Sequence, residues 1–313
     1  MFRTLDDIVE AVRERPMKTV AVAAAEHETI LGAIRQVHEQ GIAEAVLVGD
    51  RDRIEPEAEK ANLELADVAI IHESSDLAAA SRATELVSSG QADILMKGQV
   101  HTDDFLRAVL HPDKGLRSGH IMSHVFILET RHLERLTLVT DGAMNIAPDL
   151  VKKADIILNA VYIARLLGIT EPSVGVLAAT EVINPAMQAT VDAAVLAKMC
   201  QRGQFPRCQI DGPFALDNAI SEVAAQIKGI SGPVAGRCDI LLVPDIEAGN
   251  LLAKSFVYLA QGLVAGVLVG ASAPVVLTSR ADSAEAKLYS IATAMLMADM
   301  RRTSRLKIGK VHF

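Results

Sequence analysis

A serine and an arginine, Ser279 and Arg280, stand where a predicted strand gives way to a predicted helix. The apolar run Ala273–Ser279 predicts a buried strand, and Asp282 with Glu285 three residues later predicts a capping box. Ligands of open α/β sheets bind at the carboxyl ends of strands. A hydroxyl, a guanidinium and the free N–H groups of a helix N-terminus suit a phosphate or a developing oxyanion. The alternative interpretation is an ordinary loop in which Asp282 is only a cap.

Further polar side chains follow predicted strands or lie on the loops and helices after them. Each alone is typical of a solvated surface; Arg107, for example, is spaced to pair with Asp103 on a helix that Thr102 is predicted to cap. Together they place cations, an amide and a hydroxyl around strand ends, as an anionic substrate requires. The candidate substrate-binding residues are Lys97, Thr102, Arg107, Arg117, Asn250 and Lys254.

Several familiar motifs are absent from the sequence. The turn after the first predicted strand has the sequence AAAEHE, so no glycine-rich dinucleotide fingerprint follows it, and the sequence contains no P-loop. The G-x-S-x-G elbow of serine hydrolases is also missing. His120 and His124 have the spacing of a metal pair, but no carboxylate supports them. We therefore predict no metal site.

The order of the predicted elements indicates the fold class. Strand-like and helix-like segments alternate with short loops between them, which predicts a mainly parallel sheet. The aromatic fraction of 3% and the apolar fraction of 50% predict cores of small and branched aliphatic residues, as in sheets covered by helices. We predict an α/β fold of two α/β/α domains, with residues 1–142 plus 272–313 in the first and 143–271 in the second. The Gly/Asn/Pro-containing stretch Asp141–Pro148 suggests the boundary.

Charge and cysteine usage exclude several classes of partner. The net charge is −8 and there is no basic run, so neither nucleic acid nor an anionic membrane is an expected partner. No apolar run reaches the length of a membrane span. Cys200, Cys208 and Cys238 show no paired spacing and are predicted to be free thiols of a cytoplasmic protein.

Four stretches of the chain resemble one known family, the phosphotransacetylases and phosphotransbutyrylases. They are Leu95–Val109, Asp211–Ser221, Ile240–Ser255 and Val275–Ala292, and their order and spacing match from about residue 15 onward. The resemblance implies reversible transfer of an acyl group between coenzyme A and inorganic phosphate, with no metal or redox cofactor. It also implies a cleft between two α/β domains, as in the isocitrate and isopropylmalate dehydrogenases, and a homodimer or larger assembly. The segment TSRADSAEAK is more similar to the butyryl branch than to the acetyl branch.

The resemblance also implies roles for individual residues. Ser279 and Arg280 match the family's active-site pair, Arg107 matches an arginine that holds an anionic substrate, and Asn250 and Lys254 match an element near the cleft. Phosphate held by Arg280 and Arg107 would attack the thioester directly, with Ser279 stabilising the oxyanion.

One departure concerns the base that removes the coenzyme A thiol proton. Seven residues after the motif serine, where the acetyl branch has an aspartate proposed for this role, this chain has Ala286. Asp282 and Glu285 are the alternative candidates, with a helix cap as their structural interpretation.

Three other functions fit parts of the sequence. A phosphate acyltransferase acting on acyl carrier protein would need a basic docking patch, which this acidic chain does not show. A non-catalytic sensor of acyl-CoA or acyl phosphate is favoured only by Ala286. A metal-dependent decarboxylating dehydrogenase would need clustered aspartates at strand ends, and none is evident.

Overall fold

The computed structural model describes residues 1–66, 68–131, 133–302 and 308–311 and divides the chain into two compact units. The N-terminal unit consists of Leu5–His120 and Ala265–Thr303. The central unit consists of Met1–Thr4, Ile121–Val264 and Ser304–Phe313. Among the helices in these ranges, none is both long and apolar enough to cross a membrane.

The N-terminal unit contains a mostly parallel sheet. Its strands occur in the spatial order β3 (Ala69–His72), β2 (Ala43–Gly49), β1 (Lys18–Ala23), β4 (Ile94–Lys97), β11 (Val275–Val276) and β10 (Leu263–Val269). Only the pairing of β11 with β10 is antiparallel. The chain therefore runs outward from β1 to β3 and returns to β4 on the other side of β1, which is the point in such sheets where ligands bind.

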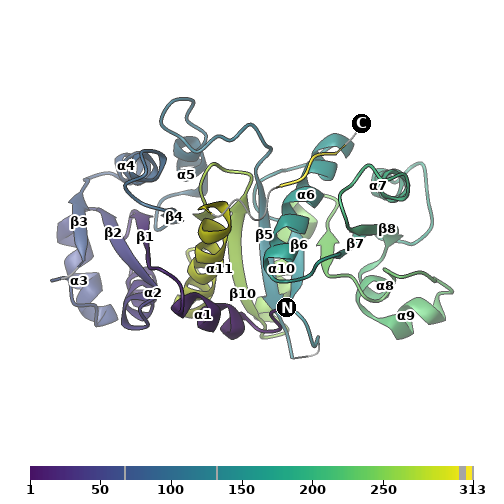
Figure 1. Cartoon of the computed structure of the whole chain (residues 1–313), viewed down its shortest axis with the longest axis horizontal. Helices are drawn as coiled ribbons and strands as arrows, with labels where there is room; N and C mark the ends of the chain where they lie inside the picture. The colour runs from purple at the N-terminus through teal and green to yellow at the C-terminus, as the bar shows by residue number, and fades with distance from the viewer. Residues whose placement is uncertain (67, 132, 303–307, 312–313) are drawn as a thin grey trace. The chain divides into compact units, whose positions relative to one another are not determined.

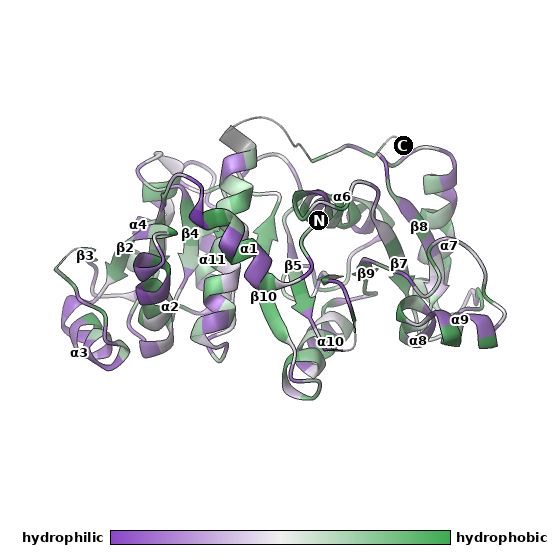
Figure 2. Cartoon of the chain, turned by 60° about the horizontal axis from the view of Figure 1, so that its bottom comes forward, coloured by the Kyte–Doolittle hydropathy of each residue, from purple (hydrophilic) through white to green (hydrophobic). Residues whose placement is uncertain are grey.

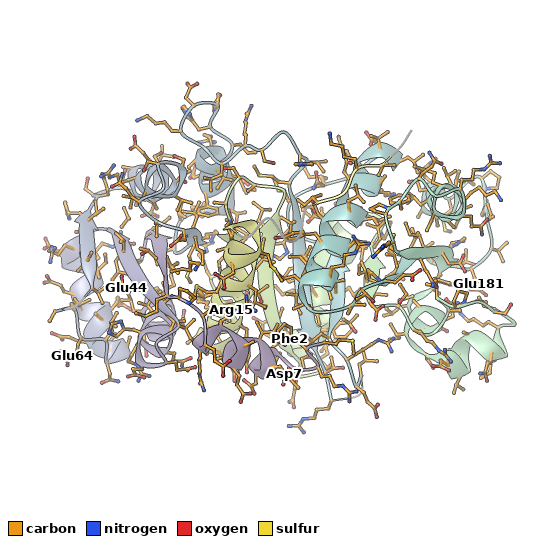
Figure 3. All side chains as sticks on the ribbon, in the orientation of Figure 1. Phe2, Asp7, Arg15, Glu44, Glu64 and Glu181 are labelled. Atoms are coloured by element: carbon orange, nitrogen blue, oxygen red, sulfur yellow. The ribbon has the colours of Figure 1, made fainter. Side chains whose placement is uncertain are left out.

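Helices cover both faces of this sheet because right-handed crossovers in opposite directions place them on opposite sides. One group, in which α2 contacts α3 and α11 and α11 contacts α1, lies on one face, and α4 and α5 pack together on the other (Figure 1). Helix α11 is buried from Ala286 to Ala298. Arg15, labelled in Figure 3, and Lys18 both reach Asp299 of α11, at 3.2 and 2.7 Å. The helices are α1 (Leu5–Arg13), α2 (Glu28–Glu39), α3 (Arg51–Ala61), α4 (Asp76–Ser88), α5 (Thr102–Val109) and α11 (Ala284–Arg302).

The central unit has a second run of strands with one antiparallel pair. The spatial order is β5 (Ser123–Glu129), β6 (Thr137–Thr140), β9 (Ile240–Leu242), β7 (Ser173–Leu177) and β8 (Gln209–Phe214), and only β5 and β6 run antiparallel. Strand β5 is coloured hydrophobic along most of its length in Figure 2, whereas α3 of the N-terminal unit is mostly hydrophilic. The helices are α6 (Leu150–Leu166), α7 (Gln188–Gln201), α8 (Leu216–Ile220), α9 (Glu222–Ile227) and α10 (Ile246–Tyr258).

The predicted α/β class with mainly parallel strands is confirmed, but the units divide the chain at other residues than predicted. The sequence placed β5 and β6 in the first domain, which was predicted to run to residue 142. In the structure they belong to the central unit, because β6 pairs with β9 and α6 packs on both strands. The chain returns from the central unit to the N-terminal unit between Val264 and Ala265, and not between residues 271 and 272 as predicted. The reason is that β10 pairs with β11.

Candidate active site

The carboxyl ends of β1, β4 and β11 meet at one edge of the N-terminal unit. The strands are parallel, with Ala23 opposite Lys97 and Met96 opposite Val276. Gly98 follows β4 and lies so close to β1 that a Cβ atom on it would come within 2.1 Å of the Ala24 carbonyl oxygen. Only glycine allows this approach, which fixes the backbone next to Lys97. The segments after β4 and β11 therefore leave the sheet side by side.

The segment after β11 forms a tight turn from Ser279 to Asp282. The Asp282 carboxylate accepts a hydrogen bond from the Ser279 N–H at 2.7 Å, and the Asp282 N–H donates to the Ser279 carbonyl at 3.1 Å. The Ser279 hydroxyl oxygen accepts from the Ala281 N–H at 3.4 Å. Three backbone donors that the sequence suggested were free for a ligand are thus used within the turn. Arg280 is exposed and Ser279 is half-buried.

The helix after this turn begins one residue later than predicted. Helix α11 starts at Ala284, and the Ser283 hydroxyl accepts from the Ala286 N–H at 3.1 Å, so Ser283 is the N-cap. The predicted capping box of Asp282 and Glu285 is wrong, because Asp282 turns back to Ser279. A similar shift occurs at α5, where His101 and not Thr102 is the N-cap.

Lys97 at this edge is a buried cation with a lowered pKa. Its side chain ends β4 with only 3% of the residue exposed, and its ammonium donates to the Gly98 carbonyl at 3.2 Å. Burial lowers the pKa of Lys97 to about 8, aided by the positive charges of Arg280 and Lys287 and opposed by Asp282. A buried lysine that titrates near neutral pH and lies among charged partners is typical of functional sites.

Lys287 lies at the same edge and was not identified from the sequence. It occupies the first turn of α11, is 1% exposed and donates to the Asp282 carbonyl. In the sequence it stands at the start of the run that forms the buried stretch of α11, where a lysine is unusual. That misfit was the available signal. Thr278, next to Ser279, has a buried hydroxyl oxygen that no described group contacts by a hydrogen bond.

The other candidate residues of the N-terminal unit have exposed side chains. Glu285 is exposed and accepts from the Tyr289 hydroxyl at 3.3 Å, and Tyr289 also donates to Asp6 of α1. Burial, followed by these carboxylates, raises the pKa of Tyr289. The Arg107 side chain is 70% exposed and pairs with Asp104 at 2.8 Å, in place of the predicted Asp103.

Thr102 and Arg117 are also exposed. Thr102 is the first residue of α5, and Arg117 donates to the Leu110 carbonyl at 2.6 Å. The structure brings together Ser279, Arg280, Asp282 and Lys97. The predicted roles of Arg107, Arg117 and Thr102 in substrate binding and of Glu285 in catalysis stay predictions.

Asn250 and Lys254 belong to the central unit. Asn250 lies on α10 and donates to the Gly142 carbonyl at 3.2 Å. Gly142 and Gly249 touch, since a Cβ atom on Gly142 would come within 2.8 Å of the Gly249 carbonyl carbon. The ammonium of Lys254 lies 5.8 Å from the centre of the Tyr258 ring. Their predicted contact with substrate stays a prediction.

His124 and the three cysteine side chains make contacts within the fold. His124 is buried on β5 with its ring 4.3 Å from that of Phe126. In the part of the chain that the structure describes, no three His, Cys, Asp or Glu side chains gather to hold a metal ion. All three cysteines are free thiols, as predicted. A side-chain hydrogen bond with Cys208 lowers the pKa of the Cys200 thiol.

Comparison with known proteins identifies the family. The sequence profile of the phosphate acetyl/butaryl transferases matches residues 3–81 and 72–295. The chain belongs to this family. It is 49% identical over 298 residues to a phosphate butyryltransferase of Clostridium acetobutylicum, covering 95% of this chain and 99% of that protein. It is 42% identical over 294 residues to a phosphate acetyltransferase of Thermotoga maritima, covering 94% and 99%.

A solved structure supports the same assignment. The crystal structure of a branched-chain phosphotransacylase from Enterococcus faecalis V583 matches with a TM-score of 0.80 and 34% identity, over 90% of this chain and 99% of that one. The resemblance found in the four sequence stretches is therefore confirmed, and these three proteins match over nearly their whole length.

Proposed function

We propose that this protein transfers a short acyl group reversibly between coenzyme A and inorganic phosphate at the edge formed by Ser279, Arg280 and Lys97. The observation that supports this most is the placement of the family's Ser-Arg pair beside a buried lysine. Acyl-CoA and phosphate are the substrates in one direction, and acyl phosphate and coenzyme A in the other. The reaction uses neither a metal nor a redox cofactor, so activity should survive dialysis against a chelator.

The preferred acyl group in this proposal is butyryl. Two phosphate butyryltransferases are 49% and 50% identical to this chain, and the acetyltransferase of Thermotoga maritima is 42% identical. The acetyl group is the second candidate for the same reason. A series from acetyl-CoA to octanoyl-CoA, with thiol release measured by dithionitrobenzoate, tests the order. A kcat/KM that is highest for butyryl-CoA supports the proposal, and a maximum at acetyl-CoA contradicts it.

The chemistry proceeds by direct attack. A phosphate oxygen forms a bond to the thioester carbonyl carbon, and the carbonyl oxygen becomes an oxyanion. The oxyanion then re-forms the carbonyl of the acyl phosphate as the C–S bond breaks and coenzyme A leaves as a thiolate. The Ser279 hydroxyl oxygen accepts a hydrogen bond from the Ala281 N–H. The proton of the Ser279 hydroxyl can therefore be donated to the oxyanion. One such donor is typically worth about 3 kcal/mol of transition-state stabilisation. Holding both substrates together supplies the entropic part of the rate enhancement.

Arg280 gives the sharpest test of the site because it is exposed and its substitution leaves the core intact. Arg280→Lys keeps the charge but loses the planar fork that binds phosphate through two parallel hydrogen bonds. We expect kcat/KM for phosphate to fall at least tenfold, about 1.4 kcal/mol, with an unchanged melting temperature. Normal kinetics in this variant would place the phosphate elsewhere. Arg107→Lys, made in parallel, shows whether the exposed α5 arginine contributes as the sequence predicted.

The same assay separates the alternatives. A sensor would bind acyl-CoA or acyl phosphate without releasing thiol, and an acyltransferase that needs acyl carrier protein would be inactive with free coenzyme A. We also propose a homodimer or larger assembly in the cytoplasm. Light scattering of the purified protein tests the assembly, and fractionation of the producing cells tests the location.

A further inference from the structure

Two buried lysines and an arginine gather at the edge that carries the Ser-Arg pair. Lys97 and Lys287 are 3% and 1% exposed, and the charges of Arg280 and Lys287 both act on Lys97. Asp282 is the carboxylate among the groups that perturb Lys97. Cations in a poorly solvated place repel one another and are costly unless anions balance them. This cluster, Lys97, Arg280, Asp282 and Lys287, contains three cationic side chains and one carboxylate.

The other buried lysines of the protein are neutralised differently. Lys18 contacts Asp299 at 2.7 Å, and Lys153 contacts Asp192 at 2.7 Å. Lys97 has no such ion pair in the described ranges, and its side-chain hydrogen bond there goes to the Gly98 carbonyl at 3.2 Å. A lysine buried without a contacting carboxylate suggests that its counterion comes from outside the chain.

We propose that the ammonium of Lys97 binds the transferred phosphoryl group beside Arg280, and that Lys287 is a positioning residue that holds the Ser279–Asp282 turn. This inference rests on the proposed acyl transfer and names the ligands of its phosphate. The ligand class is a phosphoryl dianion, as in inorganic phosphate or an acyl phosphate. The 3′-phosphate of coenzyme A has the same chemistry and must be distinguished by experiment.

Lys287 acts on the site through Asp282. Its ammonium donates to the Asp282 carbonyl, and the Asp282 carboxylate in turn accepts from the Ser279 N–H at 2.7 Å. Lys287 thereby connects the first turn of α11 to the backbone that presents Ser279 and Arg280. It also adds a positive charge that acts on Lys97.

Anion binding should be coupled to proton uptake. The charged groups that face Lys97 are Arg280 and Asp282 from the segment after β11 and Lys287 from α11. Because the pKa of Lys97 is about 8 in the ligand-free protein, a bound dianion raises that pKa and draws a proton. Below pH 7 Lys97 is already protonated and little uptake occurs. Uptake therefore grows from pH 7 through pH 9, and anion affinity falls over the same range.

Isothermal titration calorimetry of the full-length protein tests this coupling. Inorganic phosphate and, separately, sulfate are titrated at pH 6.5, 8 and 9 in two buffers of different ionisation enthalpy, which gives the number of protons bound. Sulfate stays a dianion across this range, so its uptake reports on the protein alone. We expect almost no uptake at pH 6.5 and about half a proton at pH 8, the point where Lys97 is half protonated.

Four variants make the test specific. Lys97→Met should weaken phosphate binding at least tenfold and remove the uptake. Lys97→Arg, which keeps the charge but does not titrate, should bind phosphate without uptake. Lys287→Met should move the midpoint of uptake to higher pH, because a neighbouring positive charge is gone, and a purely structural role would leave that midpoint unchanged. The exposed Lys60 on α3 provides the charge-matched control, and Lys60→Met should behave as the native protein.

Several results would overturn the proposal. Native-like phosphate affinity and uptake in Lys97→Met would exclude direct contact. A larger loss of affinity for coenzyme A alone than for phosphate would assign Lys97 to the 3′-phosphate instead. The failure of this inference is separable from that of the proposed function: butyryl transfer with no proton uptake refutes the role of Lys97 and leaves the acyltransferase activity standing.

Discussion

Lys97 carries a positive charge at neutral pH although it is buried at the end of β4, because its pKa of about 8 still lies above 7. The cost of this burial is set by the difference from the ordinary value of 10.5 and corresponds to roughly 3 kcal/mol as an upper bound. Folded proteins tolerate such a loss of stability at sites where the buried group has a function. The ligand-free enzyme is thus expected to be less stable than a variant without this charge.

Replacing Lys97 tests that expectation. The unfolded chain keeps the ordinary pKa, so between about pH 8 and 10.5 it binds more protons than the folded protein, and stability rises with pH in that window. Below pH 8 the cost is fully present. Lys97→Met should therefore unfold at higher denaturant concentration at pH 7, with an advantage of up to about 3 kcal/mol that shrinks toward pH 10. Urea denaturation of both proteins in phosphate-free buffer measures the difference; an advantage independent of pH would contradict the assignment.

At the scale of elements, the start of α11 determines how the site is presented. Asp282 and Ser283 are adjacent and both are good N-caps, so the sequence pattern alone does not decide between them. The structure selects Ser283 because Asp282 is engaged with the Ser279 N–H. At α5 the N-cap is likewise one residue away from the predicted Thr102, at His101, where no side-chain hydrogen bond caps the helix. Patterns of capping residues locate the start of a helix to within about one residue. Tertiary contacts determine which of the adjacent candidates is the N-cap.

The two roles at this helix start can be separated by substitution. Ser283→Ala removes the cap and should cost about 1 kcal/mol of stability while kcat stays nearly unchanged. Ser75→Ala is the matched control, because Ser75 caps α4 through the Ala78 N–H at 3.2 Å in the same unit. Thermal denaturation and the thiol-release assay are run on both variants. Stability equal to that of the native protein in Ser283→Ala, with a loss of about 1 kcal/mol in Asp282→Ala, would restore Asp282 as the cap.

At the scale of the whole molecule, the order of elements predicted the α/β class and four separated stretches predicted the family. The domain boundaries were harder to predict, because β5 and β6 look like a continuation of the first sheet until their partner is known. That partner, β9, lies about a hundred residues further along the chain. Lys287 escaped notice for a related reason, since only the fold shows that it points to the same edge as Lys97 rather than into solvent.

The N-terminal unit is completed by the far end of the chain. Strand β11 pairs with β4, and α11 packs against α1, α2 and β4. A chain that ends after Ala271 lacks both elements, so apolar faces of β4 and α2 lose their cover. We expect the amide protons of β1 and β4 to exchange at nearly the rate of an unfolded chain in this truncated protein, while those of β7 in the central unit stay protected. Hydrogen–deuterium exchange with mass spectrometry measures this, with the full-length chain as control. Adding a peptide of residues 272–302 should restore protection in β1. Full protection of β1 without that peptide would mean that the N-terminal unit is stable without α11.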